Sequence, residues 1–227
     1  MKRALILLGG MWHDFEGFSN NIRPVFEAAG WQMEATYDLD RLTGLEGENF
    51  DMVLAYTCFA KHGEGLDNSG PEKMSAPQIK ALTKWVRKGG ALLAAHSAAV
   101  LGHSSPELGE LIGGSFVEHP PAFAFTVFPV YGAHPITAGI EAFTVYDEMY
   151  IERYDPSVNI HMLTVDRGMA HPLVWSKSED RGRVAHIALG HSAVVWQLEP
   201  YQRLMLQAAA WLVGETTGTD SSDGEEK

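Results

Sequence analysis

Residues 89–99 read Gly-Gly-Ala-Leu-Leu-Ala-Ala-His-Ser-Ala-Ala, and this stretch decides the fold. The run Ala91–Ala95 is short and apolar, as is typical of a strand covered on both faces of a sheet. His96 follows it directly, with small residues on both sides. A sharp elbow between strand and helix requires such small flanks, because larger side chains collide in the tight turn. We therefore predict an α/β fold with His96 exposed at the head of the sheet. The alternative is that the alanines reflect close helix–sheet packing and His96 is an ordinary loop residue.

The segments before this stretch alternate between strand and helix patterns. Ser75–Lys88 is the clearest helix, since Ser75 and Gln78 form a capping box and Gly89 follows its end. The other elements predicted upstream are a strand at Arg3–Leu8, a helix at Asn20–Ala29, and strands at Trp31–Tyr37 and Phe50–Tyr56. Such a βαβ alternation predicts parallel strands joined by right-handed crossovers.

Downstream of a helix predicted at Pro106–Gly113, strand patterns follow one another without a long helix between them, which predicts an antiparallel extension of the sheet. These strands are Phe123–Val130, Glu148–Tyr154, Ile160–Val165 and Leu173–Lys177. A core strand at Arg183–Leu189 and a helix at Glu199–Val213 complete a single domain over residues 1–214. Residues 215–227 are acidic and contain no large apolar side chain, so we expect them to be disordered.

Composition excludes several classes of protein. The chain of 227 residues is 45% hydrophobic and carries a formal net charge of −12, which disfavours binding to nucleic acid. Its one cysteine, Cys58, cannot form an internal disulfide, in keeping with a reducing compartment. The apolar run Ala4–Leu8 is too short for the core of a signal peptide, and no stretch is long enough for a membrane helix. We expect a cytoplasmic protein that does not bind membranes.

Histidines follow three of the predicted parallel strands. They are His13, His96 and His191. In open α/β sheets ligands bind beyond the carboxyl ends of the strands, so we expect these imidazoles to share one pocket, with Asp14 beside His13. Cys58 also follows a strand, but we interpret it as a small buried apolar residue rather than a nucleophile.

Further candidates lie in the later half of the chain. Glu148 and Tyr150 are predicted to share one face of a strand, with Asp147 as a turn residue before them. His119 follows a glycine-rich approach to the sheet and is expected to close over a ligand. The glycine-rich loop Lys61–Gly70 is a candidate lid.

Five sequence blocks occur in a familiar order. They are Gly89–Ala98, Gly113–Phe116 leading to His119-Pro120, His134–Thr137, Asp147–Tyr150, and Gly182–Val184 leading to Leu189–His191. Together they resemble the ThuA-like (trehalose utilisation) family over residues 3–213. The resemblance implies a class I glutamine amidotransferase-like fold, that is, a flavodoxin-like three-layer α/β/α sandwich with a mostly parallel sheet.

The resemblance also implies roles for two histidines. His96 stands where true amidotransferases have a nucleophilic cysteine, and His191 stands where they have its activating histidine. Glutaminase activity is therefore not expected. The stretch Pro120–Phe123 departs from common family members, so no ligand contact is carried over to it.

Two chemistries remain open for the site. Its imidazoles can act as an acid/base pair with Glu148, or they can bind a divalent metal, Zn²⁺ or Mn²⁺, with His13, His119 or Glu148 completing the ligand set. The family is linked to 3-keto derivatives of trehalose and related sugars, which implies an enzyme that acts on a disaccharide or keto-sugar. Four aromatic residues near the sheet edge are candidates for stacking on a sugar: Trp12, Phe15, Tyr150 and Trp196.

Three alternatives concern activity and assembly. The chain could be a non-catalytic carbohydrate- or metabolite-binding module on the same scaffold, because function resides in sites rather than folds. It could also work only with a partner enzyme. A homo-oligomer is left open by the sequence.

Overall fold

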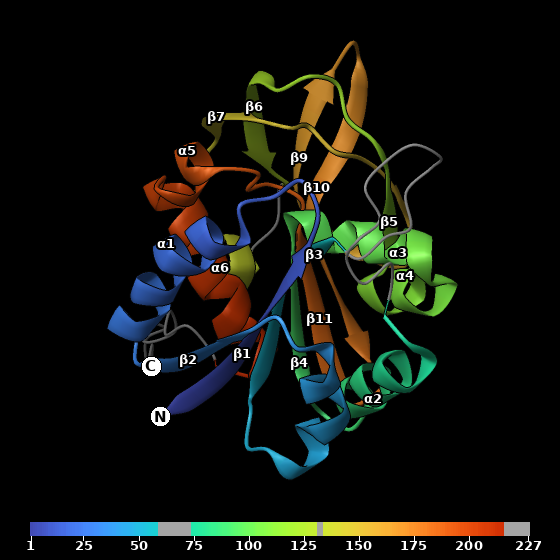
Figure 1. The fold of residues 1–227 in the computed structure, drawn as a ribbon. Helices are drawn as coiled ribbons and strands as arrows, with labels where there is room; N and C mark the ends of the chain where they lie inside the picture. Colours follow the sequence, from blue (N-terminus) through green and yellow to red (C-terminus); the bar gives the residue numbers. More distant parts are fainter. Residues whose placement is uncertain (59–73, 131–133, 216–227) are drawn as a thin grey trace, which may run out of the picture.

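The computed structural model describes residues 1–58, 74–130 and 134–215 (Figure 1). The strands are β1 (Lys2–Gly10), β2 (Trp31–Thr36), β3 (Met52–Cys58), β4 (Ala91–Ala95), β5 (Gly114–Glu118), β6 (Phe123–Pro129), β7 (Phe143–Asp147), β8 (Ile151–Tyr154), β9 (Asn159–Asp166), β10 (Met169–Glu179) and β11 (Gly182–Ile187). The α-helices are α1 (Phe15–Ala28), α2 (Ala76–Arg87), α3 (Leu101–Ser104), α4 (Pro106–Ile112), α5 (Ala193–Trp196) and α6 (Glu199–Leu212). The 3₁₀ helices are η1 (Leu39–Gly47), η2 (His96–Val100) and η3 (Pro135–Thr137).

A nine-stranded sheet with the order β2-β1-β3-β4-β11-β10-β9-β6-β7 forms the centre of the molecule. Strands β2, β1, β3, β4 and β11 are parallel to one another. Strands β10, β9, β6 and β7 extend the sheet in antiparallel pairs, and β5 pairs with β8 in a small second sheet. The predicted α/β architecture, a mostly parallel sheet with an antiparallel extension, is confirmed.

Helices cover both faces of the parallel strands. In Figure 1 helices α1, α5 and α6 lie on one side of the sheet, and α2, α3 and α4 lie on the other. Alternation along β1 explains the two layers, because successive side chains of a strand point to opposite faces. Ile6 and Leu8 belong to one apolar core with Phe18 of α1, while Leu5 and Leu7 belong to a second core.

Local signals in the sequence explain where α2 begins. The Ser75 backbone N–H donates to the Gln78 side chain at 2.8 Å, and the capping box is complete. No helix in the part of the chain that the structure describes combines the length and apolar character that a membrane crossing needs.

Two predicted elements differ from the structure. Helix α1 begins at Phe15 rather than Asn20, because the Asp14 side chain accepts the Gly17 N–H at 2.8 Å and caps the helix. The predicted strand Glu148–Tyr154 is correct only from Ile151 onward, since β7 ends at Asp147 and β8 spans Ile151–Tyr154. The residues between them leave the sheet and enter the site described below. The candidate lid at 61–70 and residues 216–227 of the acidic tail lie outside the described residues.

A buried histidine pair makes stability depend on pH. His161 is 5% exposed, its ring stacks on His134 at 4.0 Å, and its Nε2 lies 2.7 Å from the Ser176 hydroxyl. Burial, with a smaller contribution from His134, lowers the pKa of His161 to about 3. The folded state therefore resists protonation. The stability that this group contributes is present above its unfolded pKa near 6.5 and is lost as pH falls towards 3.

From His161 alone we expect the free energy of unfolding to be about 2 kcal/mol smaller at pH 5 than at pH 7.5. Urea unfolding measures the free energy of unfolding of wild type and His161→Gln at both pH values. The change between pH 7.5 and pH 5 in wild type, minus the same change in His161→Gln, gives the contribution of His161. An equal pH dependence in wild type and His161→Gln would contradict the assignment.

Candidate active site

His96 stands at the elbow that follows β4. Its backbone has φ of +40°, a left-handed conformation that side chains rarely adopt, and the ring is fully buried. Ala95 and Ala98 beside it are also fully buried, which explains the small residues of the elbow. The prediction that His96 is exposed is wrong, because Tyr150 stacks over its ring at 4.1 Å. The reading of His96 as an ordinary loop residue is also inconsistent with this geometry.

His191 is carried by a turn that follows β11 and that Asp147 holds in place. The two Asp147 carboxylate oxygens accept the N–H groups of Gly190 and His191 at 2.7 and 3.0 Å. The Tyr56 hydroxyl donates to the Gly190 carbonyl at 3.0 Å, and the Trp196 indole N–H donates to the same oxygen. Asp147 is thus a buried anchor at the end of β7, and its prediction as a turn residue is wrong.

His13 and Glu148 complete the cluster. The His13 Nδ1 lies 2.9 Å from the Met11 carbonyl, and its Nε2 lies 3.4 Å from the Tyr150 hydroxyl. Glu148 leaves the sheet directly after Asp147. One residue therefore anchors the His191 turn, while the next extends its carboxylate towards the same histidine.

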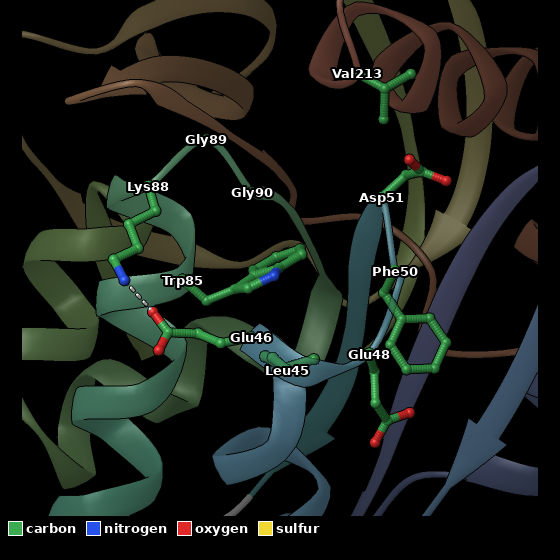
Figure 2. A pocket seen from close by; sticks show the side chains of 10 residues that line it. All are labelled: Leu45, Glu46, Glu48, Phe50, Asp51, Trp85, Lys88, Gly89, Gly90 and Val213. Atoms are coloured by element: carbon green, nitrogen blue, oxygen red, sulfur yellow. Dashed lines mark hydrogen bonds and ion pairs between the residues drawn. The ribbon is translucent and has the colours of Figure 1, made fainter.

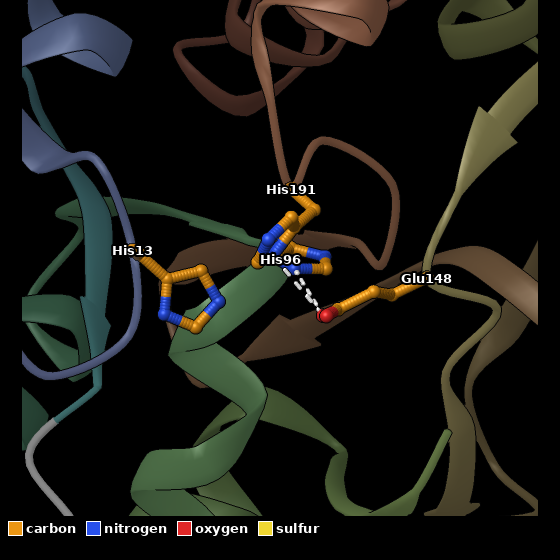
Figure 3. A group of neighbouring side chains, drawn as sticks. All are labelled: His13, His96, Glu148 and His191. Carbon is orange, nitrogen blue, oxygen red and sulfur yellow. Dashed lines mark ion pairs between the residues drawn. The ribbon is translucent and has the colours of Figure 1, made fainter. Parts of the chain in front are cut away.

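Three imidazoles approach a single oxygen of Glu148. Its Oε2 lies 3.1 Å from the His191 Nδ1, 3.6 Å from the His96 Nε2 and 3.6 Å from the His119 Nε2. One atom from each of His13, His96, Glu148 and His191 lies within 4.8 Å of the others. Figure 3 shows these four side chains, from separate segments of the chain, gathered in one place.

Hydrogen bonds outside the cluster fix which ring atoms face it. The His96 Nδ1 lies 2.7 Å from the Ala188 carbonyl, and the His13 Nδ1 lies 2.9 Å from the Met11 carbonyl. A carbonyl oxygen can only accept, so Nδ1 carries the proton in both rings and a neutral ring turns an Nε2 lone pair inward. The His96 Nε2 and the His191 Nδ1 are buried, and both face the Glu148 carboxylate. His13 and His96 thus present acceptors to the cluster, whereas His191 can carry a proton on the nitrogen that faces Glu148.

The charges of the cluster follow from these contacts. Burial, with the neighbouring His96, lowers the pKa of His13 to about 3, so its ring is neutral at physiological pH. The Glu148 carboxylate raises the pKa of His191 above its ordinary value. Burial opposes ionisation of Glu148, but the His191 and His96 imidazoles outweigh it and hold the pKa of Glu148 well below its ordinary range. The cluster therefore contains a carboxylate that attracts positive charge.

A cavity of about 500 Å³ opens above the cluster. It is lined by Trp12, His13, Cys58, Val100, His103, Phe116, His119, Glu148, Tyr150 and His191. His96 lies buried beneath it. Five of the predicted site residues thus line one cavity, namely His13, His119, Glu148, Tyr150 and His191.

Two predicted substrate-binding residues are placed elsewhere. Asp14 caps α1, and Trp196 is 1% exposed with its indole bound to the Gly190 carbonyl, so neither lines the cavity. The sequence reasoning missed Asp147, His103 and Phe116. Cys58 does line the cavity, but burial raises the pKa of its thiol to about 11, which disfavours the thiolate that nucleophilic attack needs.

A second cavity of about 600 Å³ lies at the opposite, amino-terminal edge of the parallel strands (Figure 2). Among its lining residues the ammonium of Lys88 pairs with the Glu46 carboxylate at 2.6 Å. No histidine or cysteine lines it in the part of the chain that the structure describes. The cavity above the histidine cluster is therefore the better candidate for an active site.

The order of blocks in the sequence agrees with the comparisons to known proteins. A sequence model described as ThuA, trehalose utilisation, matches residues 3–212. The chain belongs to the ThuA family. No match to a curated protein was found.

Solved structures similar to this ThuA-family chain include two ThuA-like proteins. The protein from Parabacteroides merdae is 15% identical, with a TM-score of 0.78 over 98% of this chain and 94% of that one. The protein from Bacteroides uniformis is 16% identical, with a TM-score of 0.75 over 95% and 93%. A cytoplasmic protein from Salmonella typhimurium is 11% identical, with a TM-score of 0.67 over 92% and 99%. At these identities the likeness shows the fold alone.

We expect Asp147→Asn to lower the free energy of unfolding by about 2–3 kcal/mol, because it sets an amide NH₂ against a buried backbone N–H. Urea unfolding at pH 7.5 measures this change. Asp180→Asn, at an exposed turn, is the matched control and should leave stability within about 0.5 kcal/mol of wild type. Wild-type stability of Asp147→Asn would show that Asp147 does not hold the turn.

Proposed function

We propose that this ThuA-family protein is a metal-assisted enzyme of carbohydrate metabolism that acts on a disaccharide or keto-sugar. His13, His96, His191 and Glu148 would hold the divalent ion, Zn²⁺ or Mn²⁺. The observation that carries the proposal is the convergence of four ligand atoms, in which His13 and His96 present acceptor nitrogens beside a carboxylate. Facing lone pairs repel one another unless a cation lies between them, and buried polar atoms without partners are costly.

The residues present fit such an ion. Imidazole nitrogen and carboxylate oxygen are common ligands of Zn²⁺, and ligating histidines almost always donate their other N–H to a carbonyl, carboxylate or water. His13 and His96 both do so. Zinc–ligand bonds of about 2.0–2.1 Å place tetrahedral ligand atoms about 3.4 Å apart. The distances of 3.1 and 3.6 Å from Glu148 to His191 and His96 bracket this value.

When bound, a divalent ion polarises a carbonyl or hydroxyl oxygen and lowers the pKa of a coordinated water. The chain's own residues supply orientation. Tyr150 stacks on the rings of His96 and His119, at 4.1 and 5.7 Å, and thereby fixes both imidazoles against the cavity. His119 reaches Glu148 from the loop after β5 and faces whatever the cavity holds.

The substrate class and location in this proposal have separate support. The family description, trehalose utilisation, supports a carbohydrate. His96 at the elbow and a thiol of high pKa at Cys58 argue against amidotransferase chemistry. A cytoplasmic location is in keeping with the single cysteine, which suits a reducing compartment.

Metal binding is the direct test. We expect tag-free protein to bind about one equivalent of Zn²⁺ or Mn²⁺ in calorimetric titration after chelator treatment. His96→Ala and Glu148→Gln each remove a ligand and should weaken binding at least 100-fold. His103→Ala is the matched control, because His103 lines the same cavity outside the four-residue group.

Wild type and variants that bind the metal equally weakly would contradict the proposal. Turnover of trehalose and its 3-keto derivative, followed by product analysis, separates the two functional classes. Metal-dependent conversion that is lost in His96→Ala supports an enzyme. Binding of metal and sugar without conversion favours the non-catalytic binding module.

A further inference from the structure

Trp12 is an exposed aromatic residue in a strained backbone at the rim of the candidate cavity. It has φ of +63°, it is 55% exposed, and it lines the cavity beside His13. A bulky residue at positive φ is a conformational outlier, and strain of this kind persists only where the surrounding structure enforces it. Strain clusters at ligand-binding positions, so the outlier calls for a functional explanation.

The loop before Trp12 is built to hold this position. Gly9 and Gly10, at the end of β1, have φ of +121° and +114°. A Cβ on Gly10 would lie 2.3 Å from the Cys58 carbonyl oxygen, so the loop packs directly against β3. A hydrogen bond also spans Trp12, because the ring of His13 after it donates to the carbonyl of Met11 before it. The indole is thus tied to the same loop that supplies one proposed metal ligand.

The cavity lining combines apolar and polar surface. Trp12, Val100 and Phe116 supply apolar surface, and the imidazoles and Glu148 supply polar groups. Among the described residues that line the cavity, none is Lys or Arg. Phosphate and carboxylate groups are usually bound by such cations, so the lining disfavours anionic ligands. An uncharged ring with an apolar face and a hydroxyl rim matches both surfaces.

We infer that Trp12 is the platform on which an uncharged sugar ring stacks while its oxygens reach the histidine cluster. This inference rests on the proposed function and names the group that selects the substrate. Aromatic faces bury the C–H face of a flat amphipathic ring and leave its polar edge free. The stiff loop aligns the ring before it binds, which reduces the ordering cost of association.

Calorimetric titration of metal-loaded protein with trehalose, its 3-keto derivative and trehalose 6-phosphate tests the inference. We expect Trp12→Ala and Trp12→Gly to weaken binding of the neutral sugar at least tenfold, and Trp12→Phe to weaken it less than threefold. Tyr37→Ala is the matched control, since Tyr37 is 56% exposed and does not line the cavity. Trehalose 6-phosphate should bind more weakly than trehalose to wild type.

Thermal unfolding supplies the second readout. Glycine adopts positive φ without strain, so we expect Trp12→Gly to melt about 2–4 °C above Trp12→Ala although both lose sugar binding. A purely structural role for Trp12 would leave sugar affinity unchanged in folded variants.

The outcomes separate this inference from the proposed function. If wild type binds a neutral sugar and Trp12→Ala binds it equally well, the platform is refuted and the proposed function stands. If metal-loaded wild type binds none of the three sugars, both the platform and the carbohydrate substrate are refuted. Preference for the phosphorylated sugar would overturn the assignment of an uncharged ligand.

Discussion

The site depends on one electrostatic constraint, which is that the acceptor nitrogens of His13 and His96 lie in one cluster with a carboxylate. The Met11 and Ala188 carbonyls hold the protons of His13 and His96 on the outer ring nitrogens, so no neutral ring of these two offers a donor to Glu148. Such a cluster is stable when a cation lies within it. A proton on His191 supplies part of the positive charge that stabilises the cluster, and a divalent ion supplies all of it.

The sheet makes this arrangement by bringing strand ends together. His13 and His96 follow β1 and β4, whose carboxyl ends lie at the same edge of the parallel sheet. His191 and Glu148 need an additional link, because β7 belongs to the antiparallel extension. Asp147 provides it, since its buried carboxylate binds the turn of His191 directly. The position of Glu148 is therefore coupled to that of His191.

Much of this fold and part of the site could be predicted from the sequence. Parallel strands place their carboxyl ends together, so histidines that follow them converge, and His13, His96 and His191 were predicted on that basis. Asp147 could not be predicted, because its backbone partners lie more than forty residues away and leave no local signal. Trp196 and Asp14 were misplaced because proximity to a strand end does not fix side-chain direction. Trp196 turns into the core, and Asp14 turns back to cap its own helix.

The most direct measurement is a crystal structure of Zn²⁺-loaded protein with anomalous diffraction recorded on both sides of the zinc edge. We predict one strong peak between the His13 Nε2, the His96 Nε2, the His191 Nδ1 and Glu148, at about 2.0–2.2 Å from each ligand atom. We also expect Tyr150 to remain stacked on His96. A structure in which these four side chains keep their positions with no peak among them, or with zinc bound only elsewhere, would contradict this prediction.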